Sequence, residues 1–100
     1  RVERLSDLFD QGKLFLTVKD NSNIDALRKV CEEVAKEYNE FSNIVICLYT
    51  DNDIGRELAL GIDNQISKQE YIKAWLAMYT YNPVEGAYFD ENPGDYLGAF

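Results

Sequence analysis

The chain has 100 residues, no histidine, two cysteines and a formal net charge of −8. The absence of histidine removes the commonest general base and metal ligand, and the negative charge disfavours nucleic acid, whose phosphates are bound by Lys and Arg. No apolar run reaches the roughly 18 residues of a membrane span, so we expect no membrane insertion. Length and composition predict one domain over residues 1–100, with no catalytic residues, metal ligands or cofactor.

The first nineteen positions contain two different patterns. Residues 1–11 place apolar side chains between charged ones, at a spacing that suits a short amphipathic helix or an ordered N-terminal arm. Gly12 ends this segment, and residues 13–19 then alternate as a β-strand does. Leu14 and Val18 point to one side of that strand, while Phe15 points to the other.

The clearest helix runs from Ile24 to Phe41, with apolar residues at three- and four-residue steps on one face and charges on the other. Residues 44–50 follow and are apolar on both sides, which is typical of a central strand covered on both faces. Cys31 on the helix and Cys47 on the strand are predicted to be buried thiols, with a disulfide between them as the alternative.

The second half of the chain is harder to interpret. Residues 54–66 predict a short helix or an irregular connection, because glycines weaken a helix. Ser67 to Glu70 form a capping box that favours a helix over 71–82, whereas the alternating aromatic residues favour a strand, and we predict the strand. Residues 84–100 are a turn-rich C-terminal tail, in which residues 87–89 add a short edge strand.

These elements predict an α+β fold: a small mixed sheet of three to four strands, β-α-β-β, with one long amphipathic helix packed on one face. The other face of that sheet is then aromatic, with lysines at its margin. The C-terminal tail, a second copy of the chain or a ligand would have to cover it. The candidate binding residues on this face are Phe15, Tyr49, Tyr71, Lys73, Trp75, Tyr79 and Tyr81.

The order of three segments resembles small bacterial β-α-β-β domains of unknown function, which are often secreted or envelope-associated. The segments are Phe-Leu-Thr-Val-Lys (15–19), Ile-Val-Ile-Cys-Leu-Tyr-Thr-Asp (44–51) and Tyr-Ile-Lys-Ala-Trp-Leu-Ala-Met-Tyr-Thr-Tyr-Asn-Pro (71–83). The resemblance covers residues 13–83 and implies a strand after Tyr71, but it carries over no functional residue. It leaves the compartment open; a removed signal segment would mean a periplasmic, envelope-associated or secreted protein.

Composition and the aromatic face together favour a non-enzymatic binding or interaction domain, with a protein as partner and a homodimer as one form. The alternative is an acidic inhibitor of the immunity type, which would bind a basic toxin or enzyme through its charge. An enzyme that works through two carboxylates is a third hypothesis. If the aromatic face binds a partner, Trp75→Ala should impair binding more than folding.

Overall fold

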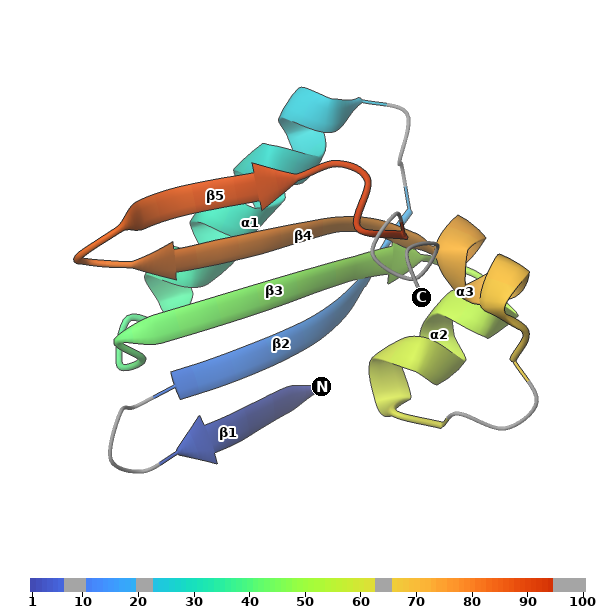
Figure 1. Cartoon of the computed structure of the whole chain (residues 1–100), viewed down its shortest axis with the longest axis horizontal. Helices are drawn as coiled ribbons and strands as arrows, with labels where there is room; N and C mark the ends of the chain where they lie inside the picture. Colours follow the sequence, from blue (N-terminus) through green and yellow to red (C-terminus); the bar gives the residue numbers. More distant parts are fainter. Residues whose placement is uncertain (7–10, 20–22, 63–65, 95–100) are drawn as a thin grey trace.

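The computed structural model describes residues 1–6, 11–19, 23–62 and 66–94, with the side chains of residues 5 and 6 left out. These residues form one mixed five-stranded sheet and three helices (Figure 1). The strands are β1 (Val2–Ser6), β2 (Gln11–Val18), β3 (Asn43–Thr50), β4 (Trp75–Asn82) and β5 (Gly86–Asp90), and the helices are α1 (Ile24–Glu37), α2 (Asp53–Leu60) and α3 (Lys68–Ala74). The predicted α+β class is confirmed, with more strands and helices than expected.

The strands lie in the sheet in the same order as in the sequence, β1-β2-β3-β4-β5. Only β2 and β3 are parallel, and α1 connects them as a crossover; the other neighbours in this described sheet are antiparallel. The β3 strand is therefore central and its residues are mostly buried, as its apolar sequence predicts.

The N-terminal segment is a strand, so the predicted short helix within residues 1–11 is wrong where the structure describes it, and the alternative of an ordered arm takes the form of a strand. β1 pairs antiparallel with β2, from Val2 opposite Leu14 to Ser6 opposite Gln11. Without β1, the edge of β2 would expose a row of unpaired backbone groups, and pairing with them outweighs the weak helical spacing of a short segment. The part of this prediction that rests on residues 7–10 lies outside the described residues.

The segment 71–82 combines the two structures that its sequence suggested. The capping box is formed: Glu70 N–H donates to Ser67 Oγ at 3.1 Å, and Ser67 N–H donates to Glu70 Oε1 at 3.1 Å. This box starts α3, which continues to Ala74 before β4 begins at Trp75. The predicted strand is therefore wrong for residues 71–74, because the capped N-terminus satisfies backbone donors that a strand would leave free.

The remaining boundaries follow from local capping. Asn23 caps α1, which ends at Glu37, earlier than the predicted end at Phe41. Asn52 caps α2 by accepting a hydrogen bond from Gly55 N–H at 2.8 Å, so residues 53–60 form a regular helix. The edge strand predicted at residues 87–89 is present as β5, at the start of the predicted C-terminal tail, and residues 95–100 lie outside the described part.

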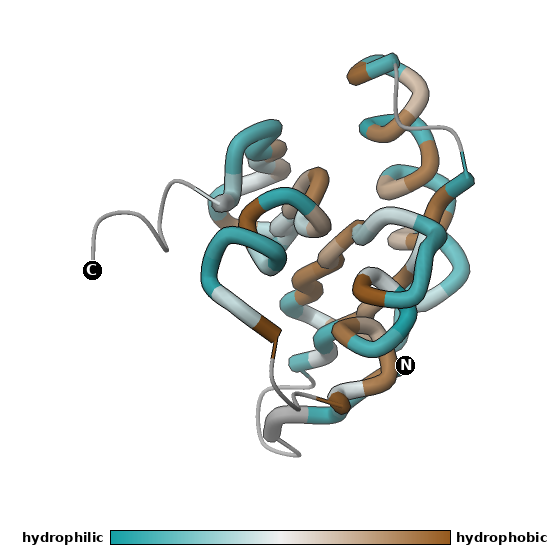
Figure 2. Tube along the Cα trace, turned by 90° about the vertical axis from the view of Figure 1, so that its right-hand side faces the viewer, coloured by the Kyte–Doolittle hydropathy of each residue, from teal (hydrophilic) through white to brown (hydrophobic). Residues whose placement is uncertain are grey.

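Within the described part, buried side chains form two clusters on opposite faces of the sheet. The first lies under α1 and includes Leu14, Cys31, Ile46 and Leu48. The second includes Leu58 and Ala59 of α2 and Ala74 of α3, and these two helices cover the other face near the ends of β3 and β2. Figure 2 shows apolar and polar residues alternating along α1, as expected for a helix with one buried face.

Gly55 provides a test of how tightly α2 packs. A Cβ atom at this position would lie 1.7 Å from the carbonyl oxygen of Thr50, and backbone cannot yield as a flexible side chain does. We expect Gly55→Ala to lower the free energy of unfolding by at least about 3 kcal/mol, measured by urea denaturation.

The matched control lies on the same helix. Leu60 is 63% exposed, so Leu60→Ala should change the free energy of unfolding by about 0.5 kcal/mol or less. Equal stability of the Gly55→Ala and Leu60→Ala variants would contradict the described approach of α2 to β3.

Candidate functional site

The structure divides the predicted aromatic face between the two sides of the sheet. Phe15, Tyr49 and Trp75 of the strands lie together with Tyr71 of α3, beside residues of α2, and we call these four the aromatic cluster. Tyr49 stacks on Phe15 at 6.5 Å and meets Tyr71 edge-on at 6.5 Å, and Tyr71 meets Trp75 edge-on at 5.7 Å. These offset and T-shaped contacts are the favoured geometries of aromatic packing.

The other three predicted residues lie elsewhere. Lys73 is exposed on α3 rather than on a strand. Tyr79 and Tyr81 pair with Ile46 and Ile44, and they therefore share the α1 side of the sheet with these two residues. The prediction that one face carries all seven residues is wrong.

A register shift between β3 and β4 explains this division. Leu48 pairs with Ala77, but the next residue, Tyr49, pairs with Trp75, so Leu76 is an extra residue. Such a bulge reverses which side of the sheet the following residues occupy. Trp75 therefore joins Tyr49, whereas Tyr79 lies on the opposite side. Strict alternation along residues 71–82 could not reveal this shift.

The aromatic cluster is core rather than an open surface. Phe15 and Tyr49 are buried, and α2 and α3 contribute Leu58, Ala59 and Ala74 to the same cluster. Burial raises the pKa of the Tyr49 hydroxyl well above its ordinary value. The indole nitrogen of Trp75 is buried there without a hydrogen-bond partner among the described residues.

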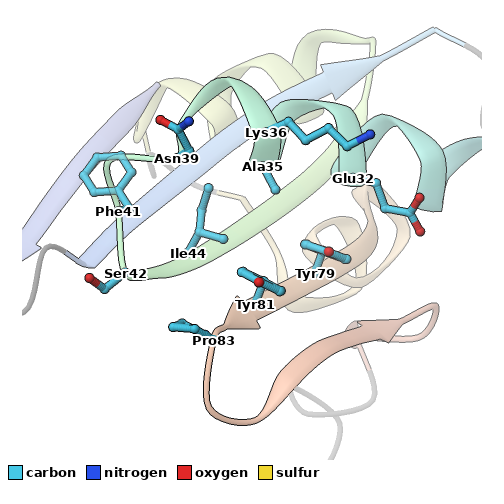
Figure 3. Close-up of a pocket in the computed structure, with 10 residues that line it drawn as sticks. All are labelled: Glu32, Ala35, Lys36, Asn39, Phe41, Ser42, Ile44, Tyr79, Tyr81 and Pro83. Carbon is cyan, nitrogen blue, oxygen red and sulfur yellow. The ribbon is translucent and has the colours of Figure 1, made fainter.

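A concave site lies on the opposite side of the sheet, and we call it the α1 groove. It has a volume of about 680 Å³ and lies between α1 and the ends of β3 and β4 (Figure 3). Its lining combines aromatic and aliphatic side chains with a few polar ones at its margin: Glu32, Ala35, Lys36, Asn39, Phe41, Ser42, Ile44, Tyr79, Tyr81 and Pro83.

Cross-strand pairing explains why this groove exists. Gly12, Ile44, Tyr81 and Ala87 form one row across the sheet, and α1 ends before it covers them completely. Gly12 has no side chain, and the ring of Phe41 occupies that space, since a Cβ on Gly12 would lie 2.4 Å from it. The row is therefore filled at Gly12, buried at Ile44 and exposed at Tyr81.

The groove combines apolar side chains with a few polar groups. Tyr79 is buried, and burial raises the pKa of its hydroxyl. Negative charge on Glu32, Cys31 or Tyr81 raises this pKa further. The Tyr79 hydroxyl therefore stays protonated at neutral pH. Lys36 lies 3.7 Å from Glu33, whereas no described residue forms an ion pair with Glu32. The groove thus offers an apolar floor, phenol groups and one free carboxylate at its margin.

A smaller pocket of about 140 Å³ lies at the other end of the sheet, beside the first turn of α2. Thr50 donates a hydrogen bond to Asn52 Oδ1 at 2.8 Å, and Asn52 also caps α2, so these polar groups already have partners. Among the described residues no group of three acidic or cysteine side chains is placed to hold a metal ion. None of the helices in the described ranges is long and apolar enough to cross a membrane.

Comparison with protein-family models, with curated proteins and with solved structures found no match for this chain. The assignment of a site therefore depends on the groove itself. Sequence patterns missed Phe41, Ile44 and Pro83 as lining residues. Gly12 was the available signal, because a glycine inside a strand often marks a close approach of another group.

Cys31 provides a pH test of the core beneath α1. Burial raises the pKa of this thiol from 9.0 to about 12, with smaller contributions from the charges of Cys47 and Glu32. The unfolded chain therefore loses this proton at lower pH than the folded chain, and stability falls as pH rises from 9.0 towards 12. In Cys31→Ala the free energy of unfolding should fall less over this range, as urea denaturation at several pH values would show.

Both proteins share every other group that titrates at alkaline pH, so the difference between their pH profiles isolates the thiol. Parallel profiles for wild type and Cys31→Ala would contradict the burial of a protonated thiol at this position.

Substitution of Trp75 tests whether the aromatic cluster is part of the core. We expect Trp75→Ala to lower the free energy of unfolding by about 3 kcal/mol, because its ring packs against Tyr71 and the residues under α2 and α3. Tyr88 is 60% exposed, so Tyr88→Ala is the control and should cost about 0.5 kcal/mol or less. A Trp75→Ala variant as stable as this control would restore the earlier interpretation of Trp75 as a surface anchor.

Proposed function

We propose that this chain is a non-enzymatic protein-interaction domain, and that its α1 groove holds an apolar or aromatic side chain of a basic partner. The supporting observation is the groove itself, which combines Ile44, Phe41 and two tyrosines with the unpaired carboxylate of Glu32. Clefts of this size with an apolar floor and few polar groups are typical of binding sites. Tyrosines contribute strongly to protein interfaces, because they combine a large apolar ring with a hydroxyl.

The charge of the chain supports a basic partner. The net charge is −8, and β3, β4 and β5 contain no Lys or Arg. Residues 75–94 include Glu85, Asp90 and Glu91 and no basic residue. A surface of one sign accelerates association with a partner of the opposite sign and discourages contact with a second copy of the same chain.

The groove replaces the aromatic face as the proposed interaction surface. Dimerisation through Tyr49 and Trp75 would require α2 and α3 to leave the aromatic cluster, which would expose Leu58 and Ala59. That cost makes a homodimer through this face a poor alternative.

The second candidate function is an acidic inhibitor of the immunity type, which the same charge favours. The two candidates differ in their consequence for the partner rather than in the binding surface. Once a partner is captured, loss of its activity on addition of this domain would identify inhibition, and full activity in the complex would identify simple association.

Selection from a phage-displayed library of random peptides tests the proposed function. We expect enriched peptides to combine Arg or Lys with an aromatic or aliphatic residue. Tyr81 is 40% exposed, so Tyr81→Ser should leave the fold intact and weaken binding of the enriched peptides by about tenfold or more. Glu32→Gln should weaken binding less, and its effect should diminish at high salt.

Leu60→Ser is the matched control, since this apolar residue is also exposed but lies on α2, on the other side of the sheet. Failure to enrich any peptide would contradict the proposal. Enriched peptides that bind Tyr81→Ser as tightly as wild type would also contradict it.

A further inference from the structure

In the part of the chain that the structure describes, the β5 edge has no lysine, proline or bulge. The β5 strand is the last strand of the described sheet, and only its β4 side has a partner strand within that sheet. Natural edge strands are usually protected by lysine, proline or a bulge. The opposite edge strand, β1, has such an irregularity between Arg4 and Ser6, whereas β5 pairs in regular register over all five of its residues, with neither Lys nor Pro.

The turn before β5 holds this edge in place. Asn82 Oδ1 accepts hydrogen bonds from Val84 N–H at 3.0 Å and Glu85 N–H at 2.7 Å. Gly86 follows with φ +84°, a conformation that other residues rarely adopt. The hairpin is therefore preorganised, which reduces the entropy that an incoming strand would have to offset.

Charge at this edge selects a basic strand over a second copy. Glu85 precedes β5 and Glu91 follows it, and Asp90 is its last residue. If two copies paired antiparallel about Tyr88, Glu85 of each chain would lie opposite Glu91 of the other. Like charges in directly opposed positions are destabilising, whereas lysines at both ends of an incoming strand would be attracted.

Cross-strand pairing links this edge to the α1 groove. Ala87 pairs with Tyr81 and Phe89 pairs with Tyr79, so these two residues of β5 point to the α1 side of the sheet. Ala87 is small and exposed, so it leaves Tyr81 accessible from the β5 side. A strand added to β5 would extend this row and place alternate side chains beside the open end of the groove.

We propose that the partner binds by β-augmentation, with an extended basic segment adding a sixth strand at the outer edge of β5. This inference rests on the proposed function, which it deepens by naming the form of the ligand. Backbone hydrogen bonds would supply affinity, the acids that flank β5 would select lysine or arginine, and the groove would select an apolar side chain.

Amide hydrogen exchange, followed by NMR during titration with a synthetic peptide, tests this directly. The probe is Lys-Thr-Val-Thr-Val-Lys, and the control is the same peptide N-methylated at two consecutive central residues so that neither edge can pair. We expect the outward N–H groups of β5 to become protected with the first peptide only, while β1 amides stay unchanged. A glutamate-ended peptide should bind at least about tenfold more weakly.

Two proline variants separate edge pairing from general damage to the fold. Ala87 and Tyr88 are neighbours, so one N–H points to β4 and the other points outward. The two variants are Ala87→Pro and Tyr88→Pro. The variant that removes the outward N–H should keep a thermal midpoint close to that of wild type and lose peptide binding. The variant that removes the N–H facing β4 should destabilise the fold.

The outcomes distinguish the inference from the proposed function. Shifts at Tyr81 and Glu32 without protection of β5 would overturn β-augmentation and leave the groove as the binding site. Binding unaffected by the outward proline would also overturn it. No shift anywhere at millimolar peptide would overturn the inference, and the library selection would then decide the proposed function separately.

Discussion

The bulge between β3 and β4 determines which aromatic side chains lie on each side of this sheet. Leu48 pairs with Ala77 and Tyr49 pairs with Trp75, so β4 has one extra residue between the two pairs. This extra residue places Trp75 on the opposite side of the sheet from Ala77. Trp75 then packs with Tyr49 under α2 and α3, and Tyr79 lies beneath α1. Without the bulge, Trp75 would share the side of Tyr79, and the aromatic cluster would lose one of its four rings.

Much of the fold could be predicted because its signals are local. The spacing in α1, the continuous apolar run of β3 and the alternation in β2 each indicate their own element. The strand β1 was missed because its pairing depends on the edge of β2 rather than on its own residues. In the same way, the capping box at Ser67 correctly signals a helix, but the aromatic residues after it obscure where that helix ends.

The candidate site was harder to predict because it depends on register. Of the seven expected residues, four lie together in the aromatic cluster, two line the α1 groove on the opposite side of the sheet, and Lys73 lies on α3. Their separation follows from one unpaired residue, Leu76, which no periodicity in a single sequence identifies. The short coverage of the sheet by α1, which leaves Tyr81 exposed, is likewise a tertiary property.

The groove, the acidic hairpin and the β5 edge lie next to one another, and this proximity is the basis of the functional account. The groove would recognise a side chain and the edge would recognise backbone, while the acids would attract a basic partner. None of these three features alone indicates a particular partner, because many proteins have an open groove. Together they support the proposal of an extended basic segment as partner, and the negative charge disfavours nucleic acid.

Trp75 and Tyr79 of β4 lie on opposite sides of the sheet, and nuclear Overhauser effects between side chains test this placement most directly. We expect contacts from the Tyr79 ring to the methyl group of Ala35 on α1, and from the Trp75 ring to Ile54 on α2. Contacts from both rings to the same helix would show that the bulge is absent. The groove and the aromatic cluster would then not exist as separate features.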